Sequence, residues 1–436
     1  MKFLFADSMD RVDPTYDFIL DDRGRSNADG SLDQWPHQYY GECGQKCYDG
    51  LLVSYAIVFG KGKKYNDAQG QRFRAQGAPD FLKFKSHPIR APIIGDCGAF
   101  AYVGEEVPPY QPEEMANFYA DCKFTHGISV DHIIFSFTEN NQVNASASDR
   151  KRYDITIRNA RKFLKYAKSK KLPFTPIASI QGWNPDSMAV AAVTYERMGY
   201  DYVAIGGLVP LKVSQIHACI SAVRKAVPRL KIHLLGVTKA DHIHEFFQYK
   251  ITTFDSTSPL IRAFKDNRHN YWADDGHYTA IRVPQIGENA SMKRRILSGR
   301  INQAEAQADE KWALSRVRAI HALKTPPVSG EVEIALEDIL RYHSYLDEEC
   351  DSIRKIHSKK KHSVTITEPW QFAWDRVRVE EYRRTLTNRP WRSCDCRVCQ
   401  EAGPEVVLFR GSNRNKRRGF HNLYWFYKRL QRLQGK

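Results

Sequence analysis

The segments FTPIASIQG (residues 174–182), DYVAIGGL (201–208) and KIHLLGV (231–237) share one pattern. Each is a short apolar run with β-branched residues that leads into glycine. The sequence between them, at 185–198 and 212–226, has apolar residues at 3.6-residue spacing, which predicts amphipathic helices. Strands that alternate with such helices are typical of a parallel sheet built from successive βα units.

The same pattern extends to both sides of this region. Five further strands are expected at 2–5, 51–58, 92–94, 131–135 and 250–254, and three further helices at 113–122, 152–169 and 240–248. Eight strands with intervening helices predict an α/β fold, a (β/α)8 TIM-like barrel. A doubly wound open sheet is the alternative, but no GxGxxG motif follows the first strand, so its dinucleotide-binding form has no support.

The sequence after the predicted barrel changes character. Charged helical segments are expected at 291–323, at 332–357 and from a Thr367 cap to Leu386, with a break at the PPVSG run of 326–330. We therefore divide the chain into a barrel over 1–285, a basic helical insertion over 286–388, and a zinc-binding subdomain with a basic C-terminal helix over 389–436.

Three cysteines and one histidine near the end of the chain have the spacing of a metal site. Cys394, Cys396 and Cys399 form a CxCxxC motif, and His421 follows after twenty-one further residues. Three thiolates and one imidazole complete a tetrahedral Zn²⁺ shell and leave no position open for water. We expect a structural zinc, so the catalytic residues must lie elsewhere.

Composition and charge narrow the class of protein. The 436 residues carry a formal net charge of +16, which predicts a polyanionic partner, nucleic acid first, although a merely solvated basic surface is the alternative. The cysteines outside the zinc motif are scattered, which argues against a secreted disulfide scaffold and for a reducing cytoplasm. The first apolar run is too short for a signal peptide, and no stretch approaches the roughly 18 apolar residues of a membrane span. We expect a cytoplasmic protein with no membrane partner.

The end of the chain is strongly basic. No acidic residue follows Glu405, whereas the following cations do: Arg410, Arg414, Lys416, Arg417, Arg418, Lys428, Arg429, Arg432 and Lys436. We expect these charges to contact phosphate. The aromatic residues at 424–427 lie among them, and we expect those to pack in the core.

In a βα barrel the active site lies at the carboxyl ends of the strands. The residues at these positions include two carboxylates, one amide and several glycines: Asp96, Ser136, Gln181, Gly206, Gly207, Leu208, Gly236 and Asp255. Together they can bind a substrate and move protons. Each alone also has an ordinary structural explanation, because aspartate often caps helices and glycine often makes turns.

The order of these motifs resembles that of the tRNA-guanine transglycosylases and of their DNA-acting relatives, the DpdA-type 7-deazaguanine DNA transglycosylases. The resemblance covers about 90–265 and 390–425. The segment Asp96-Cys-Gly-Ala-Phe100 is similar to the family's Asp-Ser-Gly-Gly-Phe, Ile180-Gln181-Gly182 to its Val-Gln-Gly, and Gly206-Gly207-Leu208 to its Gly-Gly-Leu. Asp255 falls where the family has its nucleophilic aspartate, and the cysteine–histidine motif resembles the family's zinc site.

The resemblance implies base exchange at C1′ of a guanine nucleotide. Asp255 would form a covalent glycosyl-enzyme, and Asp96 would transfer protons at the base. The base site would comprise Gln181, Gly206, Gly207, Leu208, Gly236, Ser136 and Phe100. Two displacements give net retention, so neither water nor ATP is consumed. The nucleotide must be flipped out of any stack to react.

Three features differ from the usual family pattern. Where the family has a second base-binding aspartate this chain has Ser136, and Asp131 is expected at the opposite barrel face because it precedes the predicted strand. The sequence after Asp255 is closer to the archaeal branch, which favours 7-cyano-7-deazaguanine (preQ0) as the incoming base. The 138 residues between Asp255 and Cys394, and the short segment after the zinc motif, resemble the DNA-acting members most.

We therefore predict a guanine transglycosylase, a pentosyltransferase, that acts on DNA with a base such as preQ0. An accessory protein of a DNA-modification system is a further expected partner. One alternative is an archaeal-like tRNA-guanine transglycosylase, which differs only in its polymer. A second is a noncatalytic, zinc-stabilised subunit that binds nucleic acid, against which the presence of both Asp96 and Asp255 argues.

Overall fold

The computed structural model describes residues 1–84, 91–140, 144–287, 289–346 and 376–435. Its main feature is a closed barrel of eight parallel strands in chain order, in which the first strand also pairs with the eighth. The strands are β1 (Lys2–Ala6), β2 (Gly50–Ser54), β3 (Ile93–Asp96), β4 (His126–Ile128), β5 (Thr175–Ile180), β6 (Tyr202–Ile205), β7 (Lys231–Leu234) and β8 (Thr253–Ser256). The predicted fold class is confirmed.

The helices that cover the barrel begin and end where local chemistry favours it. They are α5 (Pro112–Asp121), α6 (Ala147–Ser169), α7 (Pro185–Met198), α8 (Val213–Ala226), the 3₁₀ helix η3 (Ala240–Tyr249) and α9 (Ser258–Lys265). The side chain of Asn184 accepts from the Ser187 amide at the start of α7, and Gly199, with a φ of 93°, ends it. The helices predicted between the strands are confirmed, except that 240–248 is 3₁₀ rather than α.

Three predicted strands have different bounds, and one of them is the strand expected at 250–254, which is β8 at Thr253–Ser256. The strand expected at 131–135 is wrong, because β4 lies earlier, at His126–Ile128. Ile133 and Ile134 are each 3% exposed. The segment is therefore apolar because it is buried after the end of β4, and not because it forms a strand. The run 51–58 is also not one strand, since β2 ends at Ser54 and α2 (Tyr55–Val58) follows.

The interior of the barrel is filled by side chains from successive strands, as in other TIM barrels. This inner cluster consists of Leu4, Leu52, Ile94, Ile128, Ile177, Tyr202 and Ala204. A larger cluster packs the outer face of the strands against the helices. The loops after the first three strands carry η1 (Arg25–Asn27), α1 (Pro36–Gly41), α3 (Asp67–Gln76), α4 (Ala78–Phe81) and η2 (Ala99–Tyr102).

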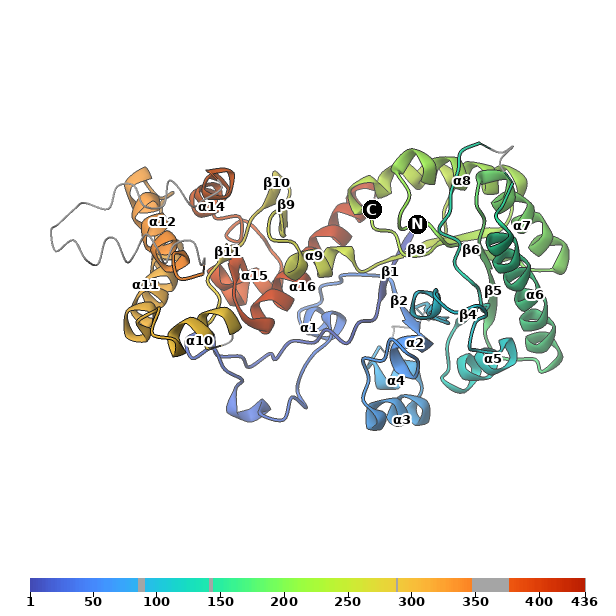
Figure 1. Cartoon of the computed structure of the whole chain (residues 1–436), viewed down its shortest axis with the longest axis horizontal. Coiled ribbons are helices and arrows are strands. Elements are labelled where there is room, and N and C mark those ends of the chain that lie inside the picture. The colour runs from blue at the N-terminus through green and yellow to red at the C-terminus, as the bar shows by residue number, and fades with distance from the viewer. Residues whose placement is uncertain (85–90, 141–143, 288, 347–375, 436) are drawn as a thin grey trace.

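A second group of elements extends away from the barrel (Figure 1). It comprises β9 (Tyr271–Ala273), β10 (Gly276–Tyr278), β11 (Ile281–Arg282), α10 (Ala290–Leu297), α11 (Gln303–Ala322), α12 (Ser329–His343), α14 (Arg376–Asn388), α15 (Arg397–Ala402), η4 (Gly403–Val407), β12 (Leu408–Phe409) and α16 (Gly411–Leu433). Helix α16 runs back to the barrel and ends beside the N-terminus, where Gln434 Nε2 donates to the Met1 carbonyl at 2.9 Å.

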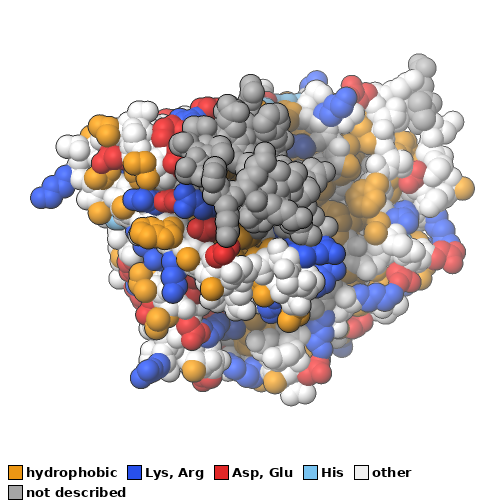
Figure 2. Space-filling model, turned by 60° about the vertical axis from the view of Figure 1, so that its left-hand side comes forward, with side chains coloured by type: hydrophobic (Ala, Val, Ile, Leu, Met, Phe, Trp, Pro, Cys, Tyr) orange, Lys and Arg blue, Asp and Glu red, His pale blue; other side chains and the backbone are white. Residues whose placement is uncertain are grey.

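The helix predicted over 291–323 is two helices, α10 and α11. Gly299, with a φ of 68°, ends the first, and the Asn302 side chain caps the second. The helix predicted over 332–357 is wrong in its extent, because α12 ends at His343 and a turn follows at 344–346. The Thr367 cap lies outside the described residues. On the face that Figure 2 shows, Lys and Arg side chains are interspersed with Asp and Glu over the described surface.

Four arginines at the start of α16 and just before it are structural. Arg410, Arg414, Arg417 and Arg418 are at most 6% exposed, so the expected phosphate contact is wrong for these four. Arg410 pairs with Glu310 at 2.6 Å and with Asp21, and Arg414 pairs with Glu405 at 2.8 Å and also with Asp21. Buried charges need such partners. The aromatic residues at 424–427 are buried as predicted.

Among the described helices, none is both long enough and apolar enough to span a membrane.

Candidate active site and metal centre

The carboxyl ends of the strands open into a cavity of about 400 Å³. Seven of the residues predicted for the site line it: Asp96, Phe100, Gln181, Gly206, Gly207, Gly236 and Asp255. Leu208 is buried and Ser136 is exposed, and neither is among the residues that line this cavity. The Ser136 hydroxyl instead donates to Asp149 Oδ2 at 2.6 Å.

Asp131 belongs to this cavity, so its expected position at the opposite barrel face is wrong. The cause is the position of β4, which ends at Ile128, so that Asp131 follows the strand instead of preceding it. Its Oδ2 accepts from Gln181 Nε2 at 2.7 Å and from the Ser179 hydroxyl at 2.8 Å. A second acidic side chain is therefore present beside Asp96, supplied by Asp131 and not by residue 136. The alternation in Gly-Ile-Ser-Val before Asp131 was the sequence signal for this arrangement.

Asp96 is held at the end of β3 by a tight turn. Its Oδ2 accepts from the Gly98 amide at 2.8 Å, and Gly98 has a φ of 81° that favours glycine. A Cβ at Gly98 would lie 2.2 Å from Ser54 Oγ, which also excludes larger residues. Removal from water, with the negative charges of Asp131 and Asp255, raises the pKa of Asp96 to about 7. Near neutral pH this carboxyl can therefore both give and take a proton.

Asp255 lies at the end of β8 and is 5% exposed. Its Oδ1 accepts from the Gly236 amide at 2.9 Å, and His233 Nε2 lies 3.1 Å from the same oxygen. Gly236, with a φ of 64°, turns its N–H toward the carboxylate. Sequence reasoning missed His233, because the histidine lies inside a strand and not after one.

Two aromatic rings are exposed beside the cavity. Phe100, which lines it, is 56% exposed, and Phe135 is 43% exposed. Their ring centroids lie 6.0 Å apart. Exposed aromatic faces of this kind can stack on a planar ring.

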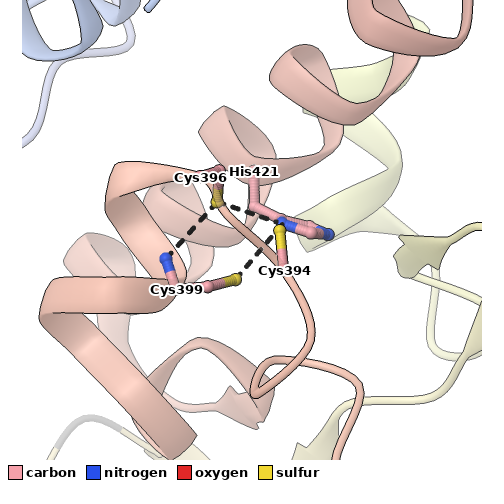
Figure 3. Close-up of side chains that lie close together, drawn as sticks. All are labelled: Cys394, Cys396, Cys399 and His421. Carbon is pink, nitrogen blue, oxygen red and sulfur yellow. Dashed lines mark hydrogen bonds between the residues drawn. The ribbon is translucent and has the colours of Figure 1, made fainter. Parts of the chain in front are cut away.

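The four predicted metal ligands come together (Figure 3). Their donor atoms lie within 4.8 Å of one another, and His421 Nδ1 is 3.5, 3.4 and 3.3 Å from the sulfur atoms of Cys394, Cys396 and Cys399. A tetrahedral Zn²⁺ with ordinary bond lengths puts nitrogen and sulfur ligands about 3.5 Å apart, so the arrangement fits this ion.

The surroundings of the histidine fit metal binding as well. His421 Nε2 donates to the Trp272 carbonyl at 2.7 Å, which fixes the tautomer and leaves Nδ1 free to bind a metal. Asn422 bonds the backbone of Asn270 and of Trp272 through its side chain, at 3.0 Å in each case. The donors come from α15, from the residues before it and from α16, so a bound ion would join these segments beside β9.

Two comparisons with known proteins bear on this site. The scan against protein-family models finds no match. The chain is 38% identical over 443 residues to a curated protein of Salmonella montevideo named DNA-guanine transglycosylase. The alignment covers 99% of this chain and 97% of the relative.

Proposed function

The chain belongs to the DNA-guanine transglycosylases, and from this premise we propose that it exchanges guanine in DNA for a 7-deazaguanine base through a covalent bond to Asp255. The observation that carries the proposal is one cavity at the carboxyl ends of the strands that holds Asp96, Asp131, Gln181 and Asp255. These side chains supply a nucleophile, a proton carrier and polar partners for a purine.

In the first step an oxygen of Asp255 forms a bond to C1′ while the bond from C1′ to N9 of guanine breaks. The bonding electrons leave with guanine, and Asp96 gives its proton to the departing base. The pKa of Asp96, raised to about 7, supports this role because the group is partly protonated at neutral pH. The products are a glycosyl ester on Asp255 and free guanine.

In the second step N9 of the incoming base attacks C1′ from the face that guanine left. The bond from C1′ to Asp255 breaks, and the N9 proton passes to the Asp96 carboxylate. Two inversions retain the β configuration, as in retaining glycosidases. The proton and charge transfers of the two steps cancel, so the cycle consumes neither water nor a nucleoside triphosphate.

The groups around Asp96 and Asp255 are proposed to recognise the base. Asp131 can accept hydrogen bonds from the N1–H and amino groups of a guanine-like ring, and Gln181 and the Gly207 backbone can bond its other edges. The bond from Gln181 Nε2 to Asp131 at 2.7 Å holds both side chains in place before the base arrives. The exposed face of Phe100 offers a stacking surface.

The incoming base that we propose is preQ0. The support is the resemblance of the sequence after Asp255 to the branch that uses this base.

We also propose that the metal is a structural Zn²⁺ held by Cys394, Cys396, Cys399 and His421. When bound, it would cross-link α15 to α16, and its complete shell leaves no position for catalysis. The insertion over 286–388 is proposed to contact the DNA around the modified base, because its length sets the chain apart from tRNA enzymes.

The test is transfer of radiolabelled guanine, and then of labelled preQ0, into duplex DNA and into tRNA by the purified protein, with each polymer assayed alone. Label is expected in DNA from both bases and not in tRNA. Entry of label into tRNA alone would assign the chain to the tRNA enzymes, and no label in either polymer would favour a noncatalytic subunit. Asp255→Asn is the control for exchange that depends on the proposed nucleophile.

A further inference from the structure

A buried chain of hydrogen bonds runs beneath Asp255 through three strands of the barrel. Tyr202 Oη lies 2.6 Å from Thr253 Oγ1, which lies 2.6 Å from His233 Nδ1, and His233 Nε2 lies 3.1 Å from Asp255 Oδ1. All four residues are at most 5% exposed, and His233 is fully buried. This series of hydrogen bonds is therefore shielded from water, and it links β6, β7 and β8.

The chemistry of the donors fixes the direction of this chain. An ionised carboxylate only accepts hydrogen bonds, so His233 Nε2 must carry a hydrogen and donate to Asp255. In the neutral ring Nδ1 is then an acceptor, and it receives the Thr253 hydroxyl hydrogen. Thr253 Oγ1 in turn accepts from the Tyr202 hydroxyl. Each of these donors then has one acceptor, and His233 is the tautomer with its hydrogen on Nε2.

The two oxygens of Asp255 consequently differ. Oδ1 receives two hydrogen bonds, from the Gly236 amide at 2.9 Å and from His233. Among the described residues no donor is found for Oδ2. Hydrogen bonds withdraw electron density from an oxygen, so the oxygen without them is the better nucleophile.

We propose that His233 is a positioning residue that, together with the Gly236 amide, holds Oδ1 of Asp255 so that Oδ2 is the oxygen that attacks C1′. This inference rests on the proposed function and adds to it the residue that orients the nucleophile. The Oδ2 lone pair forms the bond to C1′, and the electrons of the broken bond to N9 leave with guanine. In the resulting ester Oδ1 is the carbonyl oxygen.

The same two donors assist the second step. In the ester they bond to the carbonyl oxygen, and negative charge returns to the carboxylate as the bond from C1′ to Oδ2 breaks. Preorganised donors at an oxygen where charge develops stabilise the transition state. Loss of the His233 donor should therefore slow breakdown of the adduct. It should also slow formation of the adduct, because Oδ2 is then no longer held in position to attack C1′, and DNA affinity should change little.

Single-turnover trapping of the covalent protein–DNA adduct tests the inference. A guanine-containing duplex is mixed with enzyme and quenched in detergent, and adduct is counted over time and again after addition of free guanine. His233→Gln keeps an amide N–H near the position of Nε2, whereas His233→Asn reaches only the position of Nδ1. We expect His233→Asn to form and release adduct about 100-fold more slowly, and His233→Gln to recover most of the rate.

Two further variants separate positioning from folding. His126→Gln alters another histidine of the barrel strands, whose Nδ1 also contacts a threonine hydroxyl, that of Thr125 at 2.8 Å, and it should form adduct at the wild-type rate. Thr253→Val removes the donor to Nδ1 and lets the ring take the other tautomer, so it should slow adduct formation about tenfold without weakening DNA binding.

Thermal melting of each variant and DNA binding by filter retention accompany the rates. The inference is overturned if folded His233→Asn forms adduct at the wild-type rate, or if His233→Gln is as slow as His233→Asn. A wild-type protein that exchanges base without any adduct contradicts the role of Asp255 and this inference with it. A wild-type adduct with unaffected His233 variants contradicts the inference alone.

Discussion

Asp96 is the residue whose protonation links stability to catalysis. Because the pKa of Asp96 is raised to about 7 in the folded protein, its contribution favours folding at low pH and is lost as the pH rises through 7. Asp96→Asn cannot ionise and escapes this loss. The melting temperature of the variant minus that of wild type should therefore increase between pH 5 and pH 8.

The size of this effect is measurable by calorimetry, since 1 kcal/mol is worth roughly 2–4 °C in a domain of this size. We expect a change of at least about 3 °C over this range. The same variant should lose base exchange, because it can neither give nor take the proton. A melting difference that stays constant from pH 5 to pH 8 would refute the raised pKa.

Asp131 and Ser136 offer a second test at the residue scale. Asp131 lines the cavity, whereas Ser136 is exposed and bonded to Asp149. Asp131→Asn should lower kcat/KM for base exchange by about 10- to 100-fold, the usual cost of a lost hydrogen bond to a charged group. Ser136→Ala should leave kcat/KM unchanged. If Ser136→Ala lowered kcat/KM and Asp131→Asn did not, residue 136 and not Asp131 would bind the base.

At the scale of elements, strands and helices with strong periodicity are predictable from sequence. Strand β5 and helix α7 are predicted to within one residue at each end. Strand β4 is not, because its three residues, His126–Ile128, are fewer and less apolar than the buried run that follows them. An apolar composition indicates that a segment is buried, but it does not by itself distinguish a hydrogen-bonded β-strand from a buried loop. Because this strand is predicted too late in the sequence, Asp131 is expected before the strand and therefore at the wrong barrel face.

The metal site that joins α15 and α16 can be tested separately from catalysis. Cys396→Ser should lower bound zinc, measured by atomic absorption, and should lower the melting temperature, since a structural zinc contributes directly to folding. Asp255→Asn should keep both at wild-type values while it abolishes exchange. If the two variants lost zinc equally, the separation of a structural metal from a catalytic aspartate would be wrong.

At the scale of the whole molecule, the formal charge of +16 is only partly available to a partner. Arg410, Arg414, Arg417 and Arg418 are buried and bonded within the fold. A sequence shows how many cations a segment has, but their pairing depends on residues far away, such as Asp21 and Glu310. The meeting of Asp96 and Asp255 in one cavity is easier to predict, because the barrel fold itself brings strand ends together.

The remaining charge predicts DNA affinity that depends on salt. If the surface neutralises about six phosphates, affinity should fall about 10³-fold between 50 and 200 mM salt. Fluorescence anisotropy with a labelled duplex measures this slope. Binding that does not change with salt would remove the electrostatic part of the proposal.

Asp255 is proposed to become covalently bound to DNA during base exchange. The most direct measurement is mass spectrometry of the protein after it is quenched with a guanine-containing duplex and digested with nuclease and protease. We predict a deoxyribose adduct on the peptide that contains Asp255, and no adduct in Asp255→Asn. Labelled base entering DNA with no adduct on any peptide, or with the adduct on another residue, would contradict the role of Asp255 as the nucleophile.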